Sequence, residues 1–204
     1  MPTNININYV NSSADQNHPQ VFVFTSNVAT TFDNLTDNIA WRVMTNIGRG
    51  SSCNFVYPID TEVRAAWGTD RNCLTTQIQS DIGARYSVIE DGTGIILEQT
   101  GEATQQKAIE IVNDIQVPGG IAAQLYKDGK LLMTKNEVAY NQKATFVLKP
   151  TLYWGLASEI VEGQVVNSAV LNVDHFEKQD LEGVFNSTVT LVGNAQDGYF
   201  FEFS

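Results

Sequence analysis

The chain has 204 residues, 43% of them hydrophobic and only 17% charged, so it can bury a core without relying on disulfides or metals. Its 12 basic and 23 acidic residues give a net charge of −11, and the basic residues form no run. Nucleic acids and anionic membranes attract clustered cations, so this composition argues against both partners and is typical of a soluble protein. The two cysteines, Cys53 and Cys73, either form one disulfide or stay free thiols.

Alternation of apolar and polar residues runs through most of the chain and predicts β-strands. Near the N-terminus, Ile5, Ile7 and Tyr9 alternate with asparagines, which predicts a strand with one buried and one wet face. The run Val21–Phe24 is apolar on both faces, which predicts a strand covered from two sides. Further strands are expected at Ile39–Met44, Phe55–Tyr57, Glu62–Trp67, Ala84–Ile89 and Ile95–Gln99. The spacing of apolar residues in Lys107–Ile115 fits a strand or a helix, and its isoleucines and valine favour the strand.

Glycine-containing turns predict two hairpins in the middle of the chain. The segment Asp91–Gly94 separates two alternating runs, and Asp128-Gly129 joins Ile121–Lys127 to Lys130–Thr134. Asp-Gly at the centre of a turn allows the positive φ of a type I′ turn, so the second hairpin is the clearest local prediction. Near the C-terminus, Tyr199–Phe201 is again apolar on both faces. Later strands are expected at Ala144–Leu148, Leu152–Trp154, Gln164–Leu171, Ser187–Val192 and Tyr199–Phe203.

About a dozen strands with short turns and no long helix predict an all-β fold, an antiparallel β-sandwich with a closed β-barrel as the alternative. Apolar strands continue on both sides of Pro118-Gly119-Gly120, so one domain is expected over 1–204. No run approaches the ~18 apolar residues of a transmembrane helix. Residues 1–10 lack the features of a classical signal peptide, so we expect a cytoplasmic protein or one exported by another route.

Motifs for catalysis, cofactors and metals are absent from the sequence. The two histidines, His18 and His175, lie in predicted loops, which leaves little for zinc or for base catalysis. The glycine-rich segment Ile47–Cys53 lacks the lysine of a nucleotide-binding loop, but its backbone amides can cradle an anion beside Arg49. The aspartates are scattered over turns without the spacing of a calcium loop. We therefore expect no cofactor and no metal.

Aromatic side chains are the other candidates for ligand binding. Trp67, Tyr86, Tyr153 and Trp154 lie in or next to predicted strands. Tyr153 and Trp154 are neighbours and point to opposite faces, so one of them is expected at the surface. An exposed aromatic ring beside amide side chains can stack on a sugar ring, which makes a glycan one expected ligand.

The sequence favours a non-enzymatic β-sandwich that binds a ligand, or that associates with copies of itself through sparsely charged strand edges. Two alternatives stay open. A membrane-active, pore-forming β protein is consistent with the Ser- and Thr-rich strand Phe185–Val192. A hydrolase would need a carboxylate pair assembled by the fold.

Overall fold

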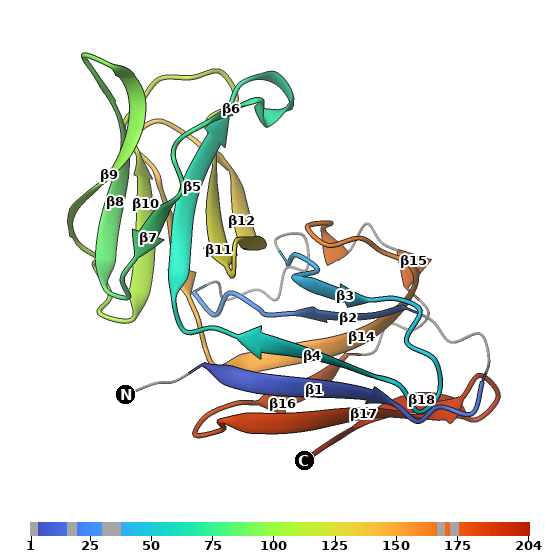
Figure 1. The fold of residues 1–204 in the computed structure, drawn as a ribbon. Coiled ribbons are helices and arrows are strands. Elements are labelled where there is room, and N and C mark those ends of the chain that lie inside the picture. The colour runs from blue at the N-terminus through green and yellow to red at the C-terminus, as the bar shows by residue number, and fades with distance from the viewer. Residues whose placement is uncertain (1–3, 16–19, 30–37, 167–169, 172–175) are drawn as a thin grey trace. The chain divides into compact units, whose positions relative to one another are not determined.

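The computed structural model describes residues 4–15, 20–29, 38–166, 170–171 and 176–204 (Figure 1). Strands account for 60% of the chain and helix for 2%. The described strands form four sheets, rich in antiparallel pairs, and none of these sheets closes into a barrel. The prediction of an all-β sandwich is confirmed, and the closed-barrel alternative is not what these strands form.

Contacts within the chain gather into two compact units. Unit 1 contains Met1–Ser26, Ile39–Ile59 and Pro150–Ser204, and unit 2 contains Asn27–Asn38 and Asp60–Lys149. Unit 2 therefore interrupts the sequence of unit 1, and no change of composition marks the points at which the chain passes from one unit to the other. A single domain over 1–204 stays a prediction, because contacts do not measure whether either unit folds independently.

Unit 1 contains two sheets, of which the first, sheet I, carries both the N-terminal and the C-terminal strands. Its order is β18-β17-β1-β4. Strands β1 and β17 pair in parallel, whereas the other two pairings are antiparallel. The strands are β1 at Ile5–Asn11, β4 at Ser52–Tyr57, β17 at Asn186–Asn194 and β18 at Gly198–Phe203.

The second sheet of unit 1, sheet II, has the order β15-β14-β2-β3, and β16 also pairs with β14. The strand expected over Gln164–Leu171 is shorter in the described residues, where it is a bridge at Val165 followed by β15, and 167–169 lie outside them. The strands are β2 at Gln20–Phe24, β3 at Arg42–Met44, β14 at Thr151–Glu159, β15 at Val170–Leu171 and β16 at Glu177–Asp180.

The core of unit 1 is built around Trp154, a fully buried residue of β14 in sheet II. Its ring packs against three rings of sheet I, with centroid distances of 6.3 Å to Tyr9, 6.2 Å to Phe55 and 5.7 Å to Phe201. Its Nε1 donates a hydrogen bond of 2.9 Å to Oε1 of Gln179. The two sheets thus face each other across a layer of aromatic rings, which is the arrangement of a sandwich.

Unit 2 also contains two sheets. Sheet III has the order β12-β11-β5-β6, with β7 pairing with β5, and sheet IV has the order β13-β10-β8-β9. Asp128 and Gly129 both have positive φ, 52° and 66°, so the predicted Asp-Gly hairpin is confirmed. The segment Lys107–Ile115 contains strand β10, as expected. The strands of sheet III are β5 at Thr61–Trp67, β6 at Cys73–Leu74, β7 at Ile78–Ser80, β11 at Ile121–Lys127 and β12 at Lys130–Val138; those of sheet IV are β8 at Ala84–Asp91, β9 at Gly94–Glu102, β10 at Ala108–Asn113 and β13 at Lys143–Val147.

Replacement of Tyr9 tests the aromatic layer of unit 1. Its ring is fully buried, and its hydroxyl has no hydrogen-bond partner within the described part of the chain. Tyr9→Phe should leave the free energy of unfolding unchanged or raise it by up to about 1 kcal/mol, because a buried unpaired hydroxyl is removed. Tyr9→Ala should lower it by about 3–5 kcal/mol, because it leaves a cavity beside Trp154.

Urea unfolding followed by tryptophan fluorescence measures both Tyr9 variants. If Tyr9→Phe lowered the free energy of unfolding by more than about 2 kcal/mol, the expectation would be contradicted, because the hydroxyl would then form a stabilising hydrogen bond in the folded protein.

Candidate functional site

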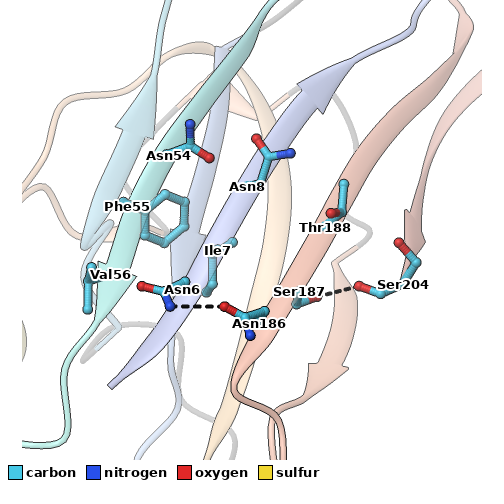
Figure 2. A pocket seen from close by; sticks show the side chains of 10 residues that line it. All are labelled: Asn6, Ile7, Asn8, Asn54, Phe55, Val56, Asn186, Ser187, Thr188 and Ser204. Atoms are coloured by element: carbon cyan, nitrogen blue, oxygen red, sulfur yellow. Dashed lines mark hydrogen bonds between the residues drawn. The ribbon is translucent and has the colours of Figure 1, made fainter. Parts of the chain in front are cut away.

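The outer face of sheet I carries uncharged amide and hydroxyl side chains in register. Ile5, Ile7 and Tyr9 are buried, so the asparagines between them point outward. Asn8 lies opposite Asn54 of β4 on one side and opposite Thr188 of β17 on the other. Figure 2 shows these three side chains as a row across three strands. We call Asn54, Asn8 and Thr188 the polar row.

The polar row lies in a shallow hollow of about 450 Å³. The hollow is open to solvent, and most of its polar atoms come from asparagine, serine and threonine (Figure 2). Its outward-facing polar residues are Asn6, Asn8, Asn54, Asn186, Thr188 and Ser204.

The polar row differs from its neighbours in its hydrogen bonding. In the next row, Nδ2 of Asn6 donates to Oδ1 of Asn186 over 2.9 Å, so these two amides are hydrogen-bonded to each other. Within the described residues, the side chains of Asn54, Asn8 and Thr188 form no hydrogen bonds, and Oδ1 of Asn8 is buried as well. A buried polar atom without a partner costs about 1–3 kcal/mol, so this row is not stabilised by hydrogen bonds within the described residues, and its accessible donors and acceptors remain open to a ligand.

The outer face of sheet I is almost free of charge. Among the outward side chains of its described strands, Glu202 of β18 is the only charged one. The whole chain carries a net charge of −11, so this face is much less charged than the average surface. Neutral polar groups therefore dominate what a ligand would meet here.

An exposed phenylalanine lies at the far end of the same face. Phe200 is 50% exposed and pairs with Val192 of β17, while its neighbour Phe201 points inward to Trp154. The apolar run Tyr199–Phe201 predicted a strand buried on both faces. This prediction is wrong, because β18 is the edge strand of sheet I and its outer face is exposed to solvent.

The hollow is lined by none of the residues predicted from the sequence as ligand contacts. Trp154 and Tyr86 are 0% and 1% exposed, so neither offers a ring face to a ligand, and these two predictions are wrong. Trp154 packs in the core of unit 1, and the hydroxyl of Tyr86 accepts a hydrogen bond from the backbone N–H of Asp81.

Three of the predicted contacts retain some exposure. Tyr153 is partly exposed, but its ring stacks on Phe24 with a centroid distance of 5.2 Å. Trp67 is partly exposed at the end of β5, and Arg49 is exposed in the turn before β4. None of the three belongs to the polar row, so their role in ligand binding stays a prediction.

The two cysteines lie in different units and outside the polar row. Cys53 in unit 1 is partly exposed and Cys73 in unit 2 is exposed; both are free thiols, so the disulfide considered from the sequence is not formed. Within the described ranges, no group of three His, Cys, Asp or Glu side chains is placed to hold a metal ion. His18 and His175 lie outside those ranges. No helix in the described part of the chain has the length and apolar composition needed to cross a membrane.

Glu110 on β10 is a buried carboxylate held by two cations on the outer face of sheet IV. Its oxygens lie 3.0 Å from Nη2 of Arg85 and 2.5 Å from Nζ of Lys143, and Glu110 is 1% exposed. Burial alone raises the pKa of Glu110, but hydrogen bonds from Lys143, Thr104 and Arg85 outweigh it, so the pKa lies below the ordinary 4.5. A carboxyl group held ionised in this way is unsuited to act as a general acid.

Comparison of the chain with models of protein families, with curated proteins and with solved structures finds no match.

The Glu110 cluster predicts a specific dependence of stability on pH. Because the folded pKa is lowered, the stabilisation is complete above the ordinary pKa of 4.5 and is lost as the pH falls through the folded value. Near pH 7, Glu110→Gln should lower the free energy of unfolding by about 1–3 kcal/mol, because Arg85 and Lys143 lose their counter-charge. Below the folded pKa the two proteins should converge.

Urea unfolding of both proteins from about pH 7 to about pH 3 measures this convergence. Glu98→Gln is the matched control, because Glu98 is an exposed carboxylate on β9 of the same sheet. A gap between Glu110→Gln and the original protein that stays constant over this range would contradict the prediction.

Proposed function

We propose that the protein is a non-enzymatic binding protein, and that the outer face of sheet I binds a neutral, polyhydroxylated ligand such as a carbohydrate. The observation that carries the proposal is the polar row. Its two amides and one hydroxyl lie in register in a hollow of about 450 Å³ and are free of hydrogen bonds within the described residues.

The chemistry of the polar row matches that of a sugar. Asn54 offers amide donors and an acceptor, Asn8 offers its Nδ2 donors, and the hydroxyl of Thr188 offers a donor and an acceptor. The hydroxyls of a sugar can therefore either donate to this row or accept from it. Neighbouring strands lie about 4.8 Å apart, so the row spans about 10 Å, enough for a short oligosaccharide. Phe200 adds an exposed apolar ring on the same face.

The scarcity of charge on this face also supports a neutral ligand. A cationic ligand would meet only Glu202 among the outward side chains of the described strands, and an anionic ligand would meet no cation there. Among the described residues, the hollow is lined by no carboxylate side chain, so it offers no carboxylate pair for the hydrolase alternative.

Self-association through the same face is the second candidate. Two molecules with a net charge of −11 repel each other, and this repulsion is smallest where the facing surfaces lack charge. Face-to-face contact of two copies of sheet I would then pair their amide rows. Sedimentation of the protein over a range of concentrations distinguishes this candidate from a monomer that binds a glycan.

The ligand proposal predicts that changes in the polar row weaken binding without unfolding the protein. A panel of neutral oligosaccharides identifies the ligand, and calorimetry with the strongest binder measures Kd. Asn54→Ala and Thr188→Val should each weaken binding by about 2- to 10-fold, the value of one hydrogen bond, and the double variant by more. Their melting temperatures should stay close to that of the original protein.

Gln99→Ala is the matched control, because Gln99 is an exposed amide on β9 of unit 2 and lies far from sheet I in the sequence. Its Kd should be unchanged. The proposal fails if no oligosaccharide binds, or if Asn54→Ala and Gln99→Ala bind the ligand equally well.

A further inference from the structure

A second polar cluster lies on the outer face of sheet III in unit 2. Val63 and Ala65 of β5 are fully buried, so Glu62 and Arg64 between them point to the opposite face. In register, Arg64 lies opposite Gln124 of β11. This face belongs to unit 2, whereas the polar row belongs to unit 1.

Neutral groups fix the orientation of the Arg64 guanidinium. Its Nε donates to Oε1 of Gln124 over 3.0 Å, one Nη donates to the hydroxyl of Tyr126, and its Cζ lies 4.7 Å from the centre of the Tyr126 ring. The Tyr126 hydroxyl in turn donates to Oε1 of Gln124 over 2.9 Å. Gln124 and Tyr126 are only 8% and 5% exposed, so their side chains form a firm support for a partly exposed cation.

Arg64 keeps unused hydrogen-bond donors. A guanidinium has five N–H groups, of which the cluster uses two, and the others have no partner among the residues that the structure describes. Over the same residues, no carboxylate forms an ion pair with it. Arg85, by contrast, is paired with Glu110.

The nearest acidic residue on the same face of β5 is held by other groups. Glu62 accepts hydrogen bonds from Nε2 of Gln77 over 2.7 Å and from Nε2 of Gln79 over 3.1 Å. Both charges of β5 are thus bound by neutral side chains instead of by each other.

We propose that Arg64 binds a small oxyanion, the carboxylate or phosphate group of a ligand, on the outer face of sheet III. The planar guanidinium matches such groups with two parallel hydrogen bonds, which are stronger than neutral ones. Because Gln124 and Tyr126 already hold the side chain, little rotational freedom is lost on binding. The net charge of the protein repels anions at long range, so binding relies on these short contacts.

Titration with acetate and, separately, with inorganic phosphate at constant ionic strength tests the proposal. Backbone amide signals of β5 and β11 in nitrogen–proton correlation spectra report binding. We expect saturable shifts centred on Arg64 and Gln124 with at least one of the two anions, and the anion with the lower Kd indicates which group the site takes.

Three variants separate the site from general attraction between charges. Arg64→Gln should weaken binding by about tenfold or more, and Tyr126→Phe should weaken it by several-fold without changing the net charge. Arg71→Gln removes the same charge from an exposed arginine of unit 2 and should leave Kd unchanged. Circular dichroism establishes whether each variant is folded. If Arg64→Gln does not fold, Tyr126→Phe still tests the site.

Shifts that stay linear in concentration with both anions would overturn the proposal. Equal weakening by Arg64→Gln and Arg71→Gln would overturn it as well, because the effect would then follow net charge and not the geometry at Arg64.

Discussion

The packing of Trp154 against the aromatic rings of sheet I is the contact on which unit 1 depends. This one side chain of sheet II touches Tyr9, Phe55 and Phe201, which lie on three strands that are distant in the sequence. With these rings fixed inward, the pleat of each strand forces its alternate residues outward. The polar row is therefore a consequence of the aromatic core, because β1 and β4 supply both inward rings and outward amides, and β17, which supplies Thr188, is paired in register with β1.

The pairing of β14 with β2 within sheet II also limits the residue next to Trp154. A Cβ atom at Gly155 would lie 2.5 Å from Cζ of Phe22, closer than atoms of a packed core approach. Glycine lets β14 lie against the rings of β2. Burial of large rings on one side and the lack of any side chain on the other together hold this strand in place.

The sheets differ in how their polar side chains are partnered. In sheet IV, Glu110 is fully compensated by Arg85 and Lys143 and serves stability. In sheet III, Arg64 is oriented by neutral partners and has N–H donors without a partner among the described residues. In sheet I, the uncharged amides of the polar row also lack hydrogen bonds within the described residues. Groups that are held in place but not satisfied are the ones suited to meet a ligand, which is why both proposals rest on them.

The sequence by itself determined the all-β class, the Asp128-Gly129 hairpin and the buried and wet faces of β1, because alternation and turn chemistry act between neighbouring residues. Only the tertiary structure decided which strands lie together. The parallel pairing that places Asn8 beside Thr188 joins residues separated by most of the chain. Exposure followed from the same long-range packing: no local pattern distinguishes Trp154, which is covered by another sheet, from Phe200, which faces solvent at an edge.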